Sequence, residues 1–151
     1  MVGINLEDSV VEQGRRSLVD STVFLHRLGE IRKGLQLAGI DIFINLRIDT
    51  YLLELPNALE ESLKRIDLYS IFIDGVFLPC ITQKEDIESI VSHTDLPLNV
   101  MSIPGLPGFD ELRDLGVKRI SSGNFLYEFI NEQLKVKTES LMSERSFDSL
   151  F

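Results

Sequence analysis

The sequence contains a single cysteine, Cys80, so no disulfide can form within the chain. Proteins without disulfides are typical of reducing compartments, and we therefore expect a cytoplasmic location. No run of residues approaches the 18 apolar positions that a membrane-spanning helix needs. The first ten residues also lack the basic region followed by an apolar stretch that marks a signal peptide, so none is predicted.

Positive charge is also scarce. The 151 residues include 15 Lys and Arg against 24 Asp and Glu, which gives a formal net charge of −9 and a pI near 4.7. Proteins bind nucleic acids through clustered basic side chains, so this balance argues against a nucleic-acid partner and against an anionic membrane surface. The hydrophobic fraction of 44% and the charged fraction of 26% are typical of a folded domain, and the length fits one domain.

Apolar segments typical of strands alternate along the chain with segments whose apolar residues recur every three or four positions, as in helices. Glycine, proline and polar residues separate most of them, and the stretch after Glu7 as far as Asp20 is expected to be a polar loop. Residues 138–151 form a tail without a predicted element. The predicted strands are 2–6, 41–46, 71–78, 97–101 and 117–120, and the predicted helices are 21–37, 58–69, 83–91, 109–115 and 124–137.

This alternation predicts an α/β fold with parallel strands and right-handed crossovers. Five strand–helix units fit either an open doubly wound sheet or most of a (β/α)₈ barrel, which needs about 250 residues. The pattern alone does not separate these two architectures. Because the chain starts inside a predicted buried strand, we expect that its beginning is missing.

Polar residues follow several of the predicted strands, and the carboxyl ends of parallel strands form the ligand-binding edge in both architectures. Glu7 follows the first strand and offers a carboxylate to a divalent cation. Arg47 follows the second and can bind a carboxylate or phosphate with two N–H groups. Ser122 and Gly123 precede a helix and could offer backbone N–H groups to an anion. Simpler alternatives stay open, namely a solvated loop around Glu7, a structural ion pair between Arg47 and Asp49, and a plain helix cap at Ser122–Gly123.

Five segments of the chain follow one another in a recognisable order. They are VGINLEDS (2–9), FINLRIDTYL (43–52), IDGVFLP (73–79), LPLNVMSIPGLPG (96–108) and LGVKRISSGNFLY (115–127). Together they resemble the isocitrate lyase / phosphoenolpyruvate mutase superfamily, and within it the phosphoenolpyruvate phosphonomutase-like group. The resemblance implies that residues 1–137 are the last five units of a (β/α)₈ barrel. It also implies descent from a Mg²⁺-dependent lyase or mutase that acts on C–C or C–P bonds of 2-oxo acids.

The resemblance also assigns roles to three residues. Glu7 matches the metal-site carboxylate, Arg47 matches the arginine that binds the substrate carboxylate, and Asn99 is expected to line the pocket. Superfamily members assemble through their C-terminal helices, so the expected partners are a small 2-oxo acid or carboxylate and either a second copy of the chain or a missing amino-terminal half.

One departure from the superfamily pattern weighs against activity. The paired aspartates that provide most of the superfamily's magnesium site have no counterpart in this sequence. Three interpretations follow: an enzyme that needs its missing half, a truncated remnant that is inactive alone, and an open α/β module that binds carboxylate or phosphate without catalysis. We expect the chain alone to be inactive.

Overall fold

The computed structural model of the protein describes residues 3–151, which form two compact units. The first unit extends to Ser121, and the second spans Ser122–Phe151. The predicted strand at residues 2–6 begins at Gly3 in the structure, and Val2 lies outside the described residues.

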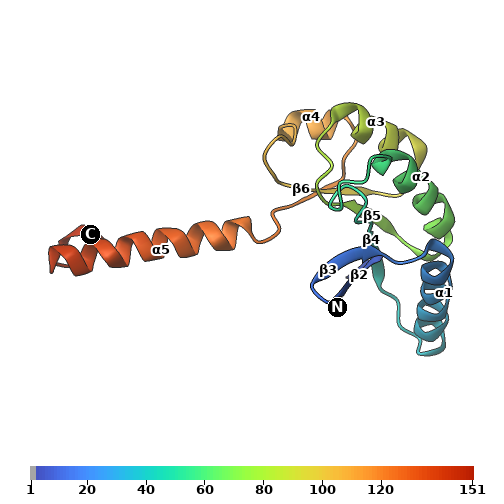
Figure 1. The fold of residues 1–151 in the computed structure, drawn as a ribbon, viewed down its shortest axis with the longest axis horizontal. Coiled ribbons are helices and arrows are strands. Elements are labelled where there is room, and N and C mark those ends of the chain that lie inside the picture. Colours follow the sequence, from blue (N-terminus) through green and yellow to red (C-terminus); the bar gives the residue numbers. More distant parts are fainter. Residues whose placement is uncertain (1–2) are drawn as a thin grey trace. The chain divides into compact units, whose positions relative to one another are not determined.

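A five-stranded parallel sheet forms the centre of the first unit, as predicted (Figure 1). Its strands lie side by side in chain order β1-β4-β5-β6-β7. Helices connect successive strands, as crossovers between parallel strands require. The strands are β1 (Gly3–Glu7), β4 (Phe43–Arg47), β5 (Gly75–Leu78), β6 (Leu98–Met101) and β7 (Arg119–Ser121), and the helices are α1 (Ser21–Leu37), α2 (Ala58–Tyr69), α3 (Lys84–His93) and α4 (Phe109–Asp114).

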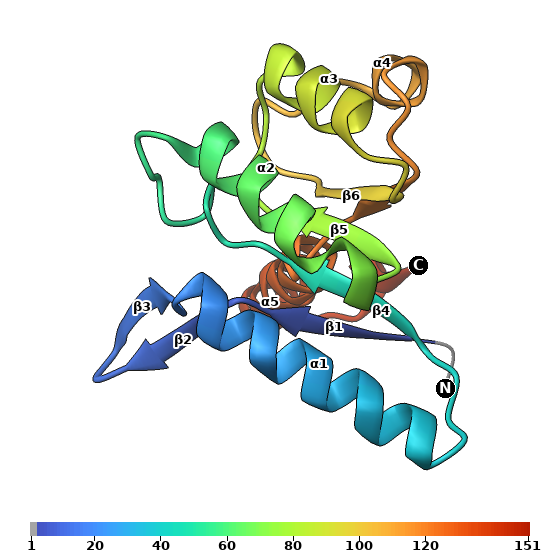
Figure 2. The ribbon, with the colours of Figure 1, turned by 90° about the vertical axis from the view of Figure 1, so that its right-hand side faces the viewer.

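The two faces of this sheet differ in chemistry because successive side chains of a strand point to opposite sides. One face packs against helices α1, α2 and α3 (Figure 2) and forms the hydrophobic core of the unit. The other face is more polar and carries the side chains that matter for the site. The buried core residues of the strands are Ile44, Leu46, Val76, Leu78, Leu98 and Val100, whereas the second face carries Asn5, Glu7, Asn45, Arg47, Phe77, Asn99 and Arg119.

A β-hairpin occupies the segment for which a polar loop was predicted. Strand β2 (Ser9–Glu12) pairs antiparallel with β3 (Arg15–Leu18). The two residues between them, Gln13 and Gly14, have φ angles of 51° and 77°. Positive φ at both positions is the geometry of the two-residue hairpin turns, which the polar sequence on either side had concealed.

The strand predicted from Ile71 begins later, at Gly75, because residues Ser70–Phe72 form a 3₁₀ helix, η1. Arg32 of α1 contributes to this shift, since its Nε donates a 2.6 Å hydrogen bond to the carbonyl oxygen of Phe72. The backbone of η1 is thereby tied to a helix rather than to the sheet.

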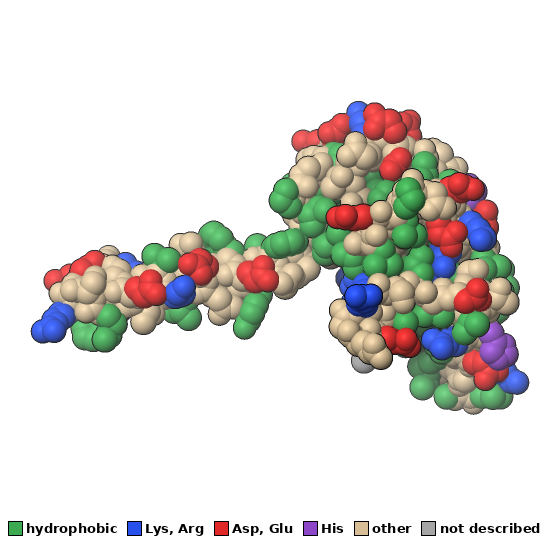
Figure 3. All heavy atoms as spheres, viewed as in Figure 1, with side chains coloured by type: hydrophobic (Ala, Val, Ile, Leu, Met, Phe, Trp, Pro, Cys, Tyr) green, Lys and Arg blue, Asp and Glu red, His purple; other side chains and the backbone are tan. Residues whose placement is uncertain are grey.

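In the second unit, helix α5 (Phe125–Glu144) continues past Lys137, where it was expected to end. It stops at Arg145, whose left-handed φ of 51° is typical of a helix end. No side chain of α5 is buried, and Figure 3 shows hydrophobic and acidic side chains side by side along it. A short 3₁₀ helix, η2 (Asp148–Leu150), follows. None of the helices in residues 3–151 is long and apolar enough to cross a membrane.

Candidate functional site

Glu7 and Arg47 lie next to each other at the carboxyl ends of β1 and β4, as the parallel sheet predicts. Arg47 Nη1 is 3.4 Å from Glu7 Oε2. The same guanidinium donates from Nε to Asp49 Oδ1 at 2.6 Å and from Nη2 to Asp49 Oδ2 at 3.4 Å. The ion pair between Arg47 and Asp49, left open above, is therefore present. Three of the five N–H groups of Arg47 are engaged, so two remain for a ligand, and 26% of the side chain is exposed.

Arg16 of the hairpin joins this pair, and the sequence analysis did not identify it. Its Nη1 lies 3.2 Å from Glu7 Oε1 and 2.9 Å from Asp49 Oδ2. The same nitrogen donates a 2.6 Å bond to Ser9 Oγ, which in turn donates to Asp49 Oδ2 at 2.5 Å. Two carboxylates are thus surrounded by two guanidinium groups, and the cluster is close to neutral.

Two buried charged side chains, Asp8 and Arg65, lie next to this cluster. Asp8, fully buried, accepts a 3.0 Å bond from the backbone N–H of Asp49 and a 2.9 Å bond from Arg65 Nη1. Arg65 also donates to Glu61 and to the carbonyl oxygen of Val19. Burial raises the pKa of Asp8, although the hydrogen bond from Asp49 and the charge of Arg65 act in the opposite direction.

Asn99 lies on the same face of the sheet as Arg47 and is only 2% exposed. It is opposite Phe77 and Arg119 in the strand register, and Phe77 is opposite Arg47. Neither Nδ2 nor Oδ1 of Asn99 has a hydrogen-bond partner within the described residues. An unpaired buried amide costs about 1–3 kcal/mol, which a ligand that bonded to it would recover.

Ser122 and Gly123 are the first residues of the second unit, whereas Arg47 belongs to the first. The backbone N–H of Phe125 donates to the Ser122 carbonyl oxygen at 3.2 Å, and Gly123 has a φ of 56°. These are the features of a turn that leads into α5. The anion-binding role suggested for this turn remains a prediction.

Magnesium was expected at Glu7, and we tested whether the side chains around it fit this cation. Both carboxylate oxygens of Glu7 face arginines, and the carboxylates of Asp8 and Asp49 accept hydrogen bonds from arginines and backbone. Among residues 3–151, no group of three or more His, Cys, Asp or Glu side chains is arranged to hold a metal ion. The described residues therefore do not form a magnesium site by themselves.

The geometry can now be compared with known proteins. The profile of the phosphoenolpyruvate phosphomutase family matches residues 1–142, and the chain belongs to this family. In two strains of Mycobacterium tuberculosis, uncharacterized proteins named MT2054 and Rv1998c are each 30% identical to it over 129 residues. The match covers 83% of this chain but 45% of each relative, so the chain spans about half their length.

Solved structures agree with this assignment. A protein of Burkholderia cenocepacia J2315, provisionally described as a phosphonomutase, is 30% identical with a TM-score of 0.82 over 92% of this chain and 59% of its own. The 2,3-dimethylmalate lyase of the phosphoenolpyruvate mutase/isocitrate lyase superfamily is 22% identical, with a TM-score of 0.79 over 94% and 50%, which shows a shared fold. The expected fold class, a partial (β/α)₈ barrel with parallel strands, is confirmed.

Proposed function

We propose that this chain binds the carboxylate of a small 2-oxo acid, as the substrate-binding part of a lyase or mutase that acts on C–C or C–P bonds. Membership of the phosphoenolpyruvate phosphomutase family supports the reaction class. The observation that carries the binding proposal is Asn99, whose buried amide has no partner among residues 3–151 and lies in the same cross-strand row as Arg47.

The donors and acceptors of this row match the ligand. A 2-oxo acid presents carboxylate oxygens and a neighbouring keto oxygen, all of which accept hydrogen bonds. Arg47 keeps two N–H groups, and Asn99 Nδ2, which is buried, holds two more that have no partner within the described residues. Phe77 lies between them in the register and is almost fully buried, so the row has an apolar centre. Because Asp49 fixes the orientation of the Arg47 fork, little entropy is lost when a carboxylate binds to it.

We further propose that the 151-residue chain does not turn over such a ligand. The superfamily resemblance implies magnesium chemistry, but both oxygens of Glu7 are held by Arg16 and Arg47. The donors for a magnesium ion would have to come from outside the described residues. On this view the row Arg47–Asn99 binds the ligand, whereas catalysis needs further groups.

The test is a calorimetric titration of the purified chain with oxalate and pyruvate, in EDTA and in Mg²⁺. We expect saturable binding that weakens about tenfold or more in Arg47→Lys, which keeps the charge but loses the bidentate fork. Asn99→Leu should weaken binding while relieving the unpaired amide, so the variant remains folded. Arg113→Gln removes an exposed arginine that pairs with Asp110 and Asp114 on α4, and should bind normally. Unchanged binding in Arg47→Lys would contradict the proposal.

A second candidate function is a non-catalytic module that binds carboxylate or phosphate. It is favoured by the absence of a metal-holding cluster among residues 3–151. The discriminating measurement is phosphate binding in EDTA, because a module for anions in general should bind phosphate as tightly as oxalate. Release of pyruvate or oxalate from oxaloacetate by the pure chain would exclude this module and the proposed lack of turnover.

A further inference from the structure

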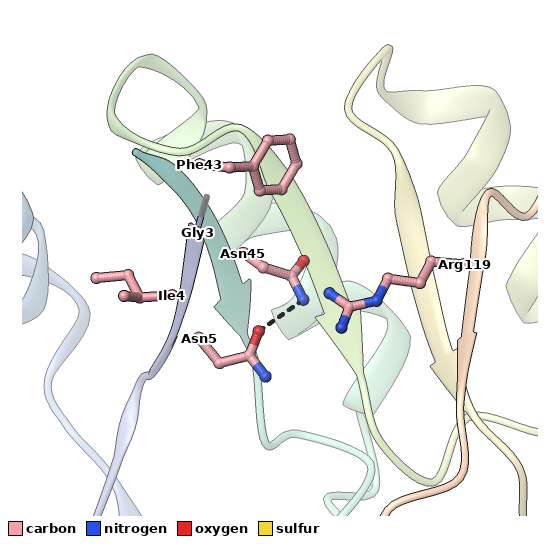
Figure 4. Close-up of a pocket in the computed structure, with 6 residues that line it drawn as sticks. All are labelled: Gly3, Ile4, Asn5, Phe43, Asn45 and Arg119. Carbon is pink, nitrogen blue, oxygen red and sulfur yellow. Dashed lines mark hydrogen bonds between the residues drawn. The ribbon is translucent and has the colours of Figure 1, made fainter. Parts of the chain in front are cut away.

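A polar hollow of about 290 Å³ lies on the same sheet face as Arg47 but near the amino ends of β1 and β4. It shares no lining residue with the cluster around Glu7 and Arg47. Its walls combine one guanidinium, two amides and one aromatic ring (Figure 4). The lining residues are Gly3, Ile4, Asn5, Phe43, Asn45 and Arg119.

Arg119 supplies the charge of this hollow. It lies on the edge strand β7, and its side chain extends across the face of the sheet toward Asn45 (Figure 4). The ion pairs within residues 3–121 involve other basic side chains, and none includes Arg119. Because no ion pair within residues 3–121 engages it, Arg119 keeps its fork of N–H groups available to a ligand.

The two asparagines form an oriented pair opposite Arg119. Asn45, 3% exposed, donates from Nδ2 to Asn5 Oδ1 at 3.0 Å. This bond fixes the amide of Asn5 so that its oxygen faces Asn45. The N–H groups of Asn5 are therefore left as donors, and they add to those of Arg119 on the same hollow.

Gly75 leaves room for two of these groups, the Phe43 ring and the Asn45 amide. A Cβ atom at this position would lie 2.9 Å from the ring of Phe43 and 3.2 Å from Asn45 Oδ1, both closer than ordinary packing distances. The absence of a side chain lets the Phe43 ring lie against β5. The ring is partly exposed and forms an apolar wall beside the polar groups.

We propose that this hollow binds a carboxylate that carries a small apolar substituent. The carboxylate oxygens take the two-pronged bond of the Arg119 guanidinium and a further bond from the amide of Asn5. The substituent packs on Phe43. The carboxylate comes either from a free small acid or from an Asp or Glu side chain of a second copy of the chain.

The test follows the side-chain N–H signals of Asn5, Asn45 and Arg119 by nuclear magnetic resonance while benzoate or acetate is added to dilute protein. We expect saturable shifts, with benzoate binding more tightly than acetate because of Phe43. A dilution series without added acid distinguishes the second source, since shifts that depend on protein concentration would assign the carboxylate to another copy. Shifts in neither series would overturn the proposal.

Variants make the result specific. Arg119→Gln should weaken binding about tenfold or more, as the loss of a charged bidentate bond implies. Lys118→Gln removes the same charge from the preceding residue, whose side chain faces the opposite way, and should leave binding unchanged. Arg47→Lys should also leave it unchanged, which separates this hollow from the proposed 2-oxo acid site. Gly75→Ala should displace the Phe43 ring or the Asn45 amide while leaving Arg119 intact, and should weaken binding. Sulfate should not shift these signals as benzoate does. Equal shifts with sulfate would contradict recognition of a carboxylate, and so would acid-induced shifts that persist in Arg119→Gln.

Discussion

At the residue scale, the buried pair of Asp8 and Arg65 holds three segments together. The carboxylate of Asp8 accepts hydrogen bonds from the backbone N–H of Asp49 and from Arg65. Arg65 in turn donates to the carbonyl oxygen of Val19. Replacing Arg65 by Gln would leave a buried carboxylate without its charged partner. We expect a loss of about 3–5 kcal/mol in the free energy of unfolding, measured by chemical denaturation.

The neighbouring Lys64 provides the matched control for this variant. Its ammonium group is 3.7 Å from Glu61 Oε2 but its side chain is mostly exposed, so Lys64→Gln should change stability little. Similar losses of stability for the two variants would show that burial does not increase the contribution of the Asp8–Arg65 pair to the free energy of unfolding.

Asp8 also predicts a dependence of stability on pH. Burial raises its pKa above the ordinary value of 3.8, so the folded chain holds this proton more tightly than the unfolded chain. The stabilising contribution of the proton is therefore fully present below pH 3.8 and is lost as pH rises through the pKa of the folded state. Denaturation of the wild type and Asp8→Asn across this range should show the wild type losing stability relative to the variant as pH rises. A constant or increasing stability of the wild type relative to Asp8→Asn would mean that Arg65 outweighs burial.

At the element scale, helix α1 shows how burial follows from periodicity. Leu28 is fully buried against the sheet, whereas Leu37 in its last turn is 81% exposed. Leu28→Ala should cost about 2–5 kcal/mol through lost burial and the cavity left behind. Leu37→Ala makes the same chemical change at the surface and should alter the unfolding midpoint little. Comparable shifts for both would argue against the packing of α1 on the sheet.

The strands and helices of the first unit could be predicted because each has a regular apolar pattern, and α1 and α2 have the predicted bounds. The hairpin could not be predicted in this way. Its turn, between the paired residues Glu12 and Arg15, is defined by positive φ angles at Gln13 and Gly14, and a backbone angle cannot be read from an apolar pattern. Helix α5 extends beyond its predicted end because its polar second half has helix-forming residues but no apolar stripe.

The site was predictable to the extent that it depends on parallel strands. Glu7 and Arg47 meet because they end neighbouring strands, and Asn99 shares their face through the register. Arg16 and Arg65 were not predictable. They reach the site from a hairpin and a helix, through contacts that only the packing of these elements creates.

At the scale of the whole molecule, α5 presents large apolar side chains without covering them. Phe129, Ile130 and Leu134 are all largely exposed on this helix. We propose that they contact a second copy of the chain, in line with the assembly through C-terminal helices that the superfamily resemblance implies. Sedimentation velocity should show concentration-dependent association of the full chain, which replacement of these three residues by Ser should reduce. Glu132→Ser is the control, and association that survives the triple change would exclude α5 as the contact.

The hairpin β2–β3 and the hydrophobic core are held by different forces, and this gives the molecule two separate responses to its surroundings. The hairpin is fastened largely through Arg16 to Glu7 and Asp49, whereas Val10 and Val11 remain exposed. High salt weakens the partly exposed pair of Arg16 with Glu7 more than the bond of Arg16 to the buried Asp49, and it hardly affects apolar burial. Hydrogen exchange in the hairpin should therefore quicken with ionic strength while exchange in β4 and β5 stays slow, so that salt alone could loosen the rim of the site within an intact fold.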